Sequence, residues 1–421
     1  MPLNLPAGRR ALAAWLRRRR LVLTLVVVAG FAGVFGAEAL WRRHSAQTRI
    51  AAAAAAPADP ARIDYARFDA RIDRLMLEPD MVGLAVGAVE RGKPRFIKGY
   101  GVTQANSADP VTPDTVFRWA SLSKGVAATL VVQLAQEGRL SLDTPVASLG
   151  TTLTLPGDAG HVTVADLLSH RLGLPHNAWD DRLEAGEDPR TLRARFGALA
   201  PACPPGTCHA YQNIAFDTAS EIVERATGQA YADVARERLF APLGMTTATL
   251  GRAGLQSAAS WARPHRLRKT PAAVQDAYYR IPAAGGVNGS ITDLVRWMLA
   301  QMGEAPAVLS PAMLDALHKD RVSTPPRGPR GPSDPKDAAY GLGWRSFTLD
   351  GHRLVGHRGS VDGYASLILF DPVDRSGILM LWNANNHRPA RLEYEFFDRL
   401  YGLPFKDRLE LKDAADPLAA G

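Results

Sequence analysis

The segment Ser121-Leu122-Ser123-Lys124 stands directly before GVAATLVVQLAQE at residues 125–137, and the interpretation of the chain starts there. Residues 125–137 are apolar on most sides and stop at Gly138, which predicts a buried helix with a glycine C-cap. Ser121 and Lys124 lie three residues apart, so their side chains share one helix face. The free N–H groups at a helix start favour negative charge on the serine oxygen, and a lysine in apolar surroundings can accept its proton.

A Ser-x-x-Lys pair occurs by chance about once in a chain of this size, so it needs partners. Taken alone, it is equally typical of a serine N-cap followed by a surface lysine. A second element, Tyr211-Gln212-Asn213, follows about ninety residues later. A nearby ammonium group favours the phenolate form of Tyr211, and Asn213 offers a substrate amide both a donor and an acceptor. Alternatively, this tyrosine packs on the core and the asparagine forms a turn.

The third element, His357-Arg358-Gly359-Ser360, lies at a turn between two predicted strands near the C-terminus. A glycine on an edge strand lets a substrate approach the backbone closely. The N–H groups of Ser121 and Ser360 could then form an oxyanion hole. The alternative is an ordinary turn with a solvated histidine and arginine. A further histidine, His170, is interpreted as structural, since the proton transfers already have candidates.

The three elements, in this order and spacing, resemble the serine β-lactamase and penicillin-binding-protein superfamily. The likeness is to its class C-like branch, which includes β-lactamase-related hydrolases, D,D-peptidases, D-aminopeptidases and esterases. It covers roughly residues 65–400. Further matching stretches are FRWA (117–120), VTVADLLSHRLGLP (162–175), PPGTCHAYQN (204–213), APLGM (241–245), PAAGGVNGSITDL (282–294) and YGLGW (340–344).

The resemblance implies a role for each motif residue. Ser121 forms an acyl-enzyme, Lys124 and Tyr211 share the proton transfers, and which of the two is the base stays open. Asn213 holds the substrate amide, and the Ser121 and Ser360 N–H groups bind the oxyanion. Gly359 stands at the position of the glycine in the usual Lys-Thr-Gly motif.

Two residues depart from the family pattern. His357 stands where many relatives have lysine, beside the incoming carboxylate or acyl group, and histidine there is familiar in peptidase, aminopeptidase and esterase-like members. Arg358 replaces a hydroxyl residue that helps to hold a substrate carboxylate. Its guanidinium could supply the same attraction by a bidentate bond, or it could point to solvent. The substrate therefore stays open at this point.

The secondary-structure pattern predicts one α/β (α+β) unit. Residues 82–90 and 94–102 predict a hairpin, and residues 352–359, 361–372 and 377–385 predict a three-stranded meander followed by a helix at about 390–401. The middle of the chain, about 139–320, is mostly helical, and residues 321–337 predict a long irregular loop. We therefore expect an antiparallel sheet from both ends of the chain, flanked by helices, with a mostly helical subdomain, as in β-lactamases and transpeptidases.

The N-terminal region predicts export. Residues 1–50 hold nine arginines and one acid, so they carry the whole formal net charge of +8. Residues 1–20 are predicted to be a cytoplasmic basic segment and residues 21–41 a single transmembrane anchor in a bacterial inner membrane. An Ala/Pro tether (42–62), a periplasmic hydrolase domain (63–405) and a C-terminal tail (406–421) follow. The alternative is a secreted protein cleaved near Ala37-Glu38-Ala39.

The remaining composition narrows the chemistry. The body beyond residue 50 is neutral, which gives no electrostatic footprint for nucleic acid. Cys203 and Cys208 are the only cysteines, and in an oxidising compartment they predict a local disulfide. No histidine spacing indicates a zinc site, and we expect no metal or cofactor.

The expected function is acyl transfer through Ser121 on β-lactams or on D-amino-acid peptides of the peptidoglycan type. A carboxylesterase on the same scaffold is the alternative, because Ser-x-x-Lys can also do ester chemistry. A non-catalytic penicillin-binding or sensor module is a third, less favoured possibility.

Overall fold

The computed structural model describes residues 60–324 and 335–411. The predicted basic segment and transmembrane anchor lie outside these residues, as does most of the predicted tether. Within the described ranges, no helix has both the length and the apolar character needed to cross a bilayer. The described residues from Ala61 onward belong to one compact unit.

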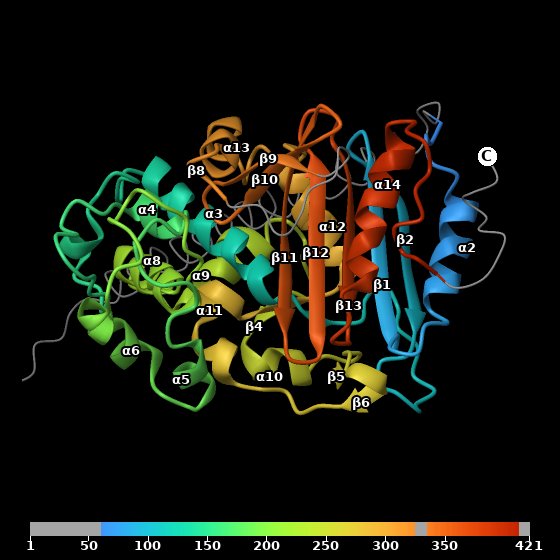
Figure 1. Ribbon diagram of the computed structural model, residues 1–421, viewed down its shortest axis with the longest axis horizontal. Coiled ribbons are helices and arrows are strands. Elements are labelled where there is room, and N and C mark those ends of the chain that lie inside the picture. Colours follow the sequence, from blue (N-terminus) through green and yellow to red (C-terminus); the bar gives the residue numbers. More distant parts are fainter. Residues whose placement is uncertain (1–59, 325–334, 412–421) are drawn as a thin grey trace, which may run out of the picture. The chain divides into compact units, whose positions relative to one another are not determined.

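An antiparallel sheet of eight strands forms the centre of this unit, with the order β2-β1-β13-β12-β11-β10-β9-β8 (Figure 1). Its first hairpin pairs directly with the last strand, so both ends of the chain build one sheet, as predicted. The strands are β1 (Gly83–Glu90), β2 (Lys93–Gly101), β8 (Val322–Ser323), β9 (Lys336–Tyr340), β10 (Arg345–Leu349), β11 (His352–Val361), β12 (Tyr364–Asp371) and β13 (Ser376–Trp382).

One part of the sheet differs from the sequence prediction. Residues 321–337 were expected to form an irregular loop, but β8 and the start of β9 lie within that range and pair with each other. The prolines that indicated a loop stand mostly between these two short strands, at residues 325–334, which are outside the described part of the chain. The strand residues themselves extend the sheet at its edge, where short strands are common.

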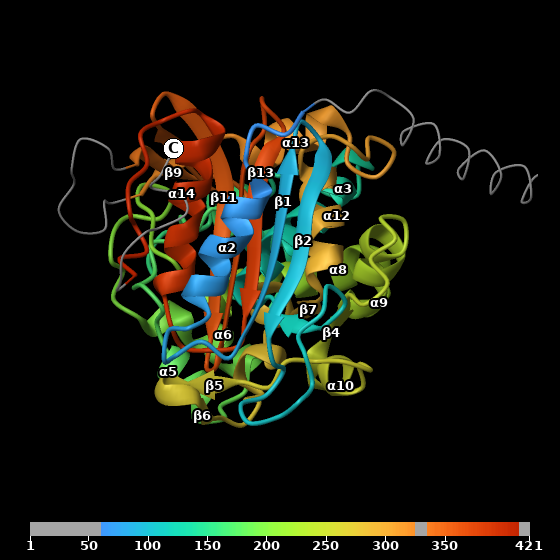
Figure 2. The ribbon, with the colours of Figure 1, turned by 90° about the vertical axis from the view of Figure 1, so that its right-hand side faces the viewer.

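Two helices from opposite ends of the sequence cover one face of the sheet (Figure 2). They are α2 (Tyr65–Leu75) and α14 (Leu392–Leu400), and the second confirms the helix predicted near 390–401. Between them Arg71 is buried and donates to Glu395 at 2.8 and 2.9 Å. A buried ion pair of this kind fixes the position of one helix on the other, because removing either charge leaves its partner unpaired.

The limits of the folded domain are wider than predicted. Arg62, assigned to the tether, forms ion pairs with Glu90 and Asp374. At the other end, Leu409 of the predicted tail is fully buried, and its N–H donates to Glu395. A tether or tail is predicted from low apolar content. That criterion cannot detect a single residue that is held to the domain by ion pairs, or one leucine that is buried.

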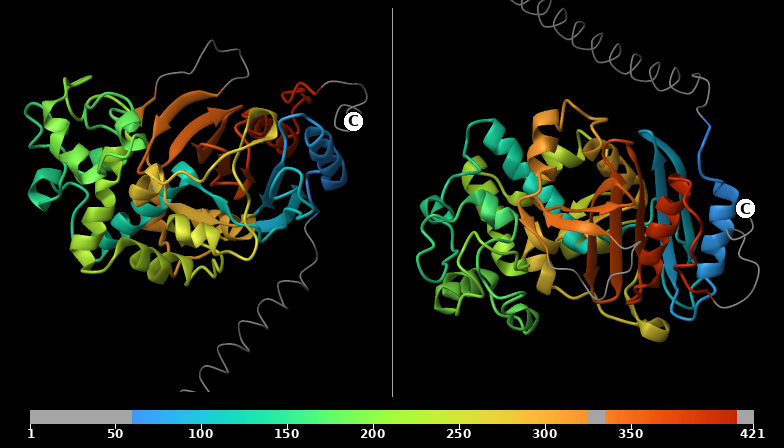
Figure 3. Two further views of the ribbon diagram at one scale, coloured as in Figure 1. Left: turned by 90° about the horizontal axis from the view of Figure 1, so that it is seen from below. Right: turned by 45° about the horizontal axis from the view of Figure 1, so that its top comes forward.

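Helices cover the opposite face of the sheet and continue into a helical region beside it (Figures 1 and 3). The buried helix α3 (Ser123–Gln136) runs between the two and ends before Gly138, whose φ is +73°, as predicted. The other helices are α4 (Val164–Leu168), α5 (Asp180–Glu184), α6 (Pro189–Arg195), α7 (Asn213–Phe216), α8 (Thr218–Thr227), α9 (Tyr231–Ala235), α10 (Gly251–Gln256), α11 (Pro282–Gly285), α12 (Ile291–Gln301) and α13 (Pro311–His318). Small sheets join β3 (Phe117–Arg118), β7 (Val287–Gly289) and β4 (Thr249–Leu250), and β5 (His265–Arg266) with β6 (Thr270–Pro271).

The turn that leads into α3 is strained and held from several sides. Ala120 has a φ of +48°, in the left-handed region that non-glycine residues rarely adopt. The Ser366 hydroxyl of β12 donates to the Trp119 carbonyl at 2.7 Å, and the Ser123 hydroxyl donates to the Ala120 carbonyl at 2.6 Å. Gly359 of β11 lies against the same turn. These contacts fix the backbone around Ser121 before any ligand binds.

Gly359→Ala should destabilise the fold, because an added Cβ would lie 2.5 Å from the Trp119 carbonyl oxygen and 2.3 Å from the Ser366 hydroxyl. Overpacking of this kind costs about 1–3 kcal/mol. The free energy of unfolding in urea measures it. Gly160→Ala is the matched control, because its Cβ would meet only one atom, at 4.0 Å. Equal unfolding free energies for the two variants would contradict the close approach.

Candidate active site

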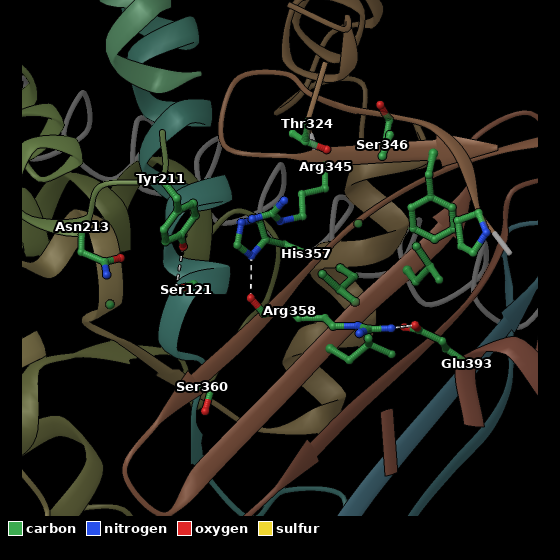
Figure 4. Close-up of a pocket in the computed structure, with 18 of the residues that line it drawn as sticks. Ser121, Tyr211, Asn213, Thr324, Arg345, Ser346, His357, Arg358, Ser360 and Glu393 are labelled. Carbon is green, nitrogen blue, oxygen red and sulfur yellow. Dashed lines mark hydrogen bonds and ion pairs between the residues drawn. The ribbon is translucent and has the colours of Figure 1, made fainter. Parts of the chain in front are cut away.

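Ser121 lies in the short helical turn Ala120–Leu122, directly before α3. Its Oγ accepts hydrogen bonds from the Tyr211 hydroxyl at 2.9 Å and from Lys124 Nζ at 3.3 Å (Figure 4). The structure therefore brings the three predicted catalytic residues together, although they come from two segments ninety positions apart. The Ser121 hydroxyl therefore lies within proton-transfer distance of two side chains, the phenol of Tyr211 and the amine of Lys124.

Lys124 is completely buried, and its ammonium group is held by three neutral acceptors. Besides Ser121, Nζ donates to Asn213 Oδ1 at 2.7 Å and to the Ala284 carbonyl at 3.0 Å. It also lies 4.7 Å from the centroid of the Tyr211 ring. No carboxylate of the described residues forms an ion pair with it. Neutral acceptors therefore hold the ammonium group within hydrogen-bond distance of the Ser121 hydroxyl.

Tyr211 is held in place by His170 beneath it. The two ring centroids are 4.3 Å apart, and His170 Nδ1 accepts the Gln212 N–H at 3.2 Å. Burial lowers the pKa of His170 well below its usual value, and the charge on Lys124 acts in the same direction. A neutral histidine that accepts a backbone hydrogen bond positions the neighbouring tyrosine. This supports the structural interpretation of His170.

Asn213 occupies the first position of α7, on the side of Ser121 away from His357 (Figure 4). While its Oδ1 accepts from Lys124, its Nδ2 donates to the Asp180 carboxylate at 2.7 Å. The amide therefore has a fixed orientation, with its oxygen toward the lysine and its nitrogen toward α5. Asn213 was predicted in the site from the Tyr211-Gln212-Asn213 motif, whereas Asp180 belongs to none of the motifs.

The segment before Tyr211 is closed by the predicted disulfide between Cys203 and Cys208. The chain on either side of it is tied to the loop that carries His170, since the Ala202 N–H donates to Gly173 and the Ala210 N–H donates to His170. The disulfide loop therefore leads directly into the backbone that positions Tyr211.

His357 of β11 lines the cleft but makes two hydrogen bonds within the protein. Its Nδ1 lies 2.7 Å from the Arg358 carbonyl oxygen, and its Nε2 lies 2.9 Å from the Tyr340 hydroxyl. The carbonyl can only accept, so Nδ1 carries a proton and Nε2 can accept from Tyr340. The ring is therefore oriented by both neighbours, unlike the flexible lysine found at this position in many relatives.

Arg358 points away from Ser121 toward Glu393 (Figure 4), whereas the sequence left its guanidinium open between a substrate carboxylate and solvent. It follows His357 on β11, so its side chain alternates to the other side of the strand. There it pairs with Glu393 of α14, whose side chain is buried (Figure 4). A buried carboxylate needs such a partner, and this requirement decides where the arginine points.

Arg345 supplies a cation that the sequence analysis missed. It begins β10, directly after the YGLGW stretch, and its guanidinium carbon lies 5.2 and 5.6 Å from the ring centroids of Tyr340 and Tyr211. It forms no ion pair with a carboxylate in residues 60–324 or 335–411. No motif in the sequence includes Arg345, and no strand was predicted between residues 337 and 352.

The backbone of β11 runs beside Ser121. A Cβ added at Gly359 would lie 3.0 Å from the Ser121 nitrogen, so no larger residue fits there without a shift. Ser360 follows and lines the same cleft, which has a volume of about 640 Å³. A cleft of this size accommodates a small peptide or drug-sized ligand. The placement is consistent with an oxyanion hole between the Ser121 and Ser360 N–H groups, which stays a prediction.

Comparison with known proteins agrees with this geometry. The chain is 29% identical to penicillin-binding protein 4 of Amycolatopsis lactamdurans, over 80% of this chain and 90% of that protein. It is also 29% identical to the unguisins hydrolase ungD' of Aspergillus campestris, over 75% of this chain. That match spans only 62% of the fungal protein's length.

Two solved structures share the fold. The octameric penicillin-binding protein homologue from Pyrococcus abyssi has a TM-score of 0.71 at 24% identity, covering 81% of this chain and 78% of its own. The D-alanine carboxypeptidase AmpC from Burkholderia cenocepacia has a TM-score of 0.62 at 24% identity, covering 80% of this chain and 98% of its own. Residues 68–401 match the Beta-lactamase family, and the chain therefore belongs to that family, within the superfamily of serine β-lactamases and penicillin-binding proteins.

Proposed function

We propose that this protein acts through an acyl-enzyme on Ser121, with β-lactams or D-amino-acid peptides as substrates. The observation that carries the proposal is the Ser121 hydroxyl held between Tyr211 and Lys124 at the edge of the cleft. Ser121 Oγ attacks the carbonyl carbon and its proton passes to the Tyr211–Lys124 pair. That proton then reaches the leaving nitrogen as its bond to the carbonyl carbon breaks, and water later releases the acyl group.

The substrate is proposed to lie across Ser121, with its acyl half against Asn213 and its leaving group toward His357 and Arg345. Asn213 would contact the amide of the acyl half, and the Ser121 and Ser360 N–H groups would stabilise the oxyanion. Arg345 replaces Arg358 as the proposed partner of a carboxylate on the leaving group. Its support is an accessible guanidinium with no carboxylate partner in the described part of the chain.

An ester substrate is the second candidate, favoured by His357, which stands where many relatives have lysine. Both of its ring nitrogens are held within the protein, by Tyr340 and by the Arg358 carbonyl. A ring held in this way would suit an uncharged leaving group as well as a peptide. The same nucleophile would serve, since the alcohol of an ester is a better leaving group than an amine.

We further propose that the catalytic domain is exported and held at the outer face of a bacterial inner membrane by residues 21–41. The arginines before that apolar run and the Cys203–Cys208 disulfide support the proposal, because disulfides persist in oxidising compartments. A tether would keep the active site near wall-bound substrates. Secretion after cleavage near Ala37 is the alternative.

Protein recovered from the membrane fraction should gain no mass from alkylation before reduction and two alkyl groups after it, as expected for a disulfide formed outside the cytoplasm. Mass spectrometry of the intact chain measures both states. Two free thiols in unreduced protein would contradict export to an oxidising compartment, and a mature N-terminus after Ala39 would identify cleavage.

Wild-type protein mixed with a fluorescent penicillin should gain a covalent label that Ser121→Ala abolishes, because the acyl group has no other attachment point. Ser257→Ala, on an exposed surface, should label like the wild type. Gel fluorescence and intact mass measure the label. If millimolar penicillin leaves no label while short-chain nitrophenyl esters are turned over faster than a chromogenic cephalosporin, the ester function replaces the proposal.

Arg345→Gln should lower kcat/KM for an acyl-D-Ala-D-Ala peptide by at least about tenfold relative to the same peptide ending in an amide, because only the free carboxylate pairs with the guanidinium. The ratio of the two rates is measured for each variant. Arg358→Gln is the comparison: it should reduce stability through Glu393 and leave the ratio as in the wild type. A ratio that changes in Arg358→Gln and stays constant in Arg345→Gln would contradict this assignment.

A further inference from the structure

The Asp180 carboxylate has no cationic partner, although it lines the active-site cleft. Its Oδ2 accepts from Asn213 Nδ2 at 2.7 Å and lies 3.4 Å from the Tyr278 hydroxyl. Its Oδ1 is buried and has no hydrogen-bond partner in the described residues. No lysine, arginine or histidine of those residues lies within ion-pair distance of it. This differs from Glu393 and Glu395, the buried carboxylates of α14, which each face an arginine.

The surroundings of Asp180 shift its titration. Burial raises the pKa of its carboxyl to about 6, and the charge on Glu184 contributes to that rise. The hydrogen bond from Asn213, the charge on Lys124 and the hydrogen bond from Tyr278 lower the same pKa. An ionised carboxylate that is largely buried and lacks a counter-ion is costly to keep, because desolvation is only partly offset by neutral donors. Such a group within a binding cleft is a candidate for contact with a ligand.

The position of Asp180 complements that of Arg345. Asn213 lies on one side of Ser121, and Arg345 and His357 lie on the other (Figure 4). Asp180 contacts the side of Asn213 that faces away from Lys124. Among the described residues, the cleft therefore has an acidic group without a cationic partner beyond one end of the Ser121 site and a basic group without a carboxylate partner beyond the other. A ligand that neutralises both would be positive on its acyl half and negative on its leaving group.

We propose that Asp180 binds a cationic amine on the acyl half of the substrate, next to Asn213. The inference rests on the proposed function, since it uses the same substrate orientation. The amine would donate to the carboxylate, whose Oδ1 has no other donor. Two sources share this chemistry: the free α-amine of an N-terminal D-residue, and an amine at the end of a longer side chain.

A different role for Asp180 would be to hold Asn213 in place without touching the substrate. Removing its charge would then slow every substrate by a similar factor. Recognition of an amine predicts a selective effect, since a neutral substrate does not use the charge. The ratio of kcat/KM between charged and neutral substrates therefore separates the two roles.

The test uses Asp180→Asn, which keeps an oxygen for Asn213 while removing the charge. The substrates are D-Ala-p-nitroanilide, Nα-acetyl-D-Lys-p-nitroanilide and, as neutral references, the Nα-acetyl derivatives of D-Ala- and D-norleucine-p-nitroanilide. We expect the ratio of charged to neutral kcat/KM to fall at least about tenfold for one of the two amines, which also identifies its source. The matched control is Asp181→Asn, an exposed neighbour of the same charge, which should leave the ratio unchanged.

Binding to Ser121→Ala protein gives a second measurement that does not require turnover. One of the two amines, D-alaninamide or D-lysine amide with an acetylated α-amine, should bind at least about tenfold more tightly than its neutral reference, and Asp180→Asn should remove the difference. Equal losses for all ligands, or no change of either ratio, would overturn the proposal. An absence of penicillin label with this binding ratio intact would refute the proposed action on β-lactams and leave the amine site standing.

Discussion

The buried ammonium group of Lys124 needs hydrogen-bond acceptors, and three separate parts of the chain supply them. Ser121 provides one from the turn before α3, Asn213 one from the start of α7, and Ala284 one from α11. A charged group removed from water loses several kcal/mol of solvation unless such contacts replace it. Packing around this one group therefore brings the helical region against the sheet-bound turn and sets the distances within the catalytic cluster. Tyr211 belongs to the same cluster, because its ring centroid lies 4.7 Å from Lys124 Nζ.

The surroundings of Ser121 combine a strained backbone with a rigid frame. Contacts from β12 and α3 keep Ala120 in the left-handed region. Gly359 of β11 packs so closely against this turn that a side chain at its position would clash. Strain of this size persists only when the surrounding structure determines it from several directions. The result is a Ser121 whose position is set by the protein itself. In the proposed function, substrate selection then falls to the ends of the cleft, where Asp180 and Arg345 differ in charge.

The sequence predicted the parts of this structure that local patterns encode. The hairpin, the C-terminal strands, α3 with its glycine end and the disulfide follow from periodicity, turn residues and cysteine spacing. Ser121, Lys124, Tyr211 and Asn213 were identified by their motifs, and the structure places them in contact. The direction of Arg358 stayed open between a substrate carboxylate and solvent, because it depends on Glu393, a residue on a helix across the sheet. Arg345 and Asp180 had no signal in the sequence, because their proposed roles rest on lacking an oppositely charged partner among the described residues, which only the three-dimensional arrangement reveals.

The use of both chain ends for one sheet has a consequence for biosynthesis. Ser121 belongs to the first third of the sequence, yet its turn leans on Gly359 and Ser366, more than two hundred residues later. The β1–β2 hairpin likewise has to wait for β13 before it gains its inner neighbour. A ribosome-bound chain can contain the complete Ser-x-x-Lys motif and still lack the surface that holds it. The geometry around Ser121 is consequently complete only at the end of synthesis, when the last strands have joined the sheet.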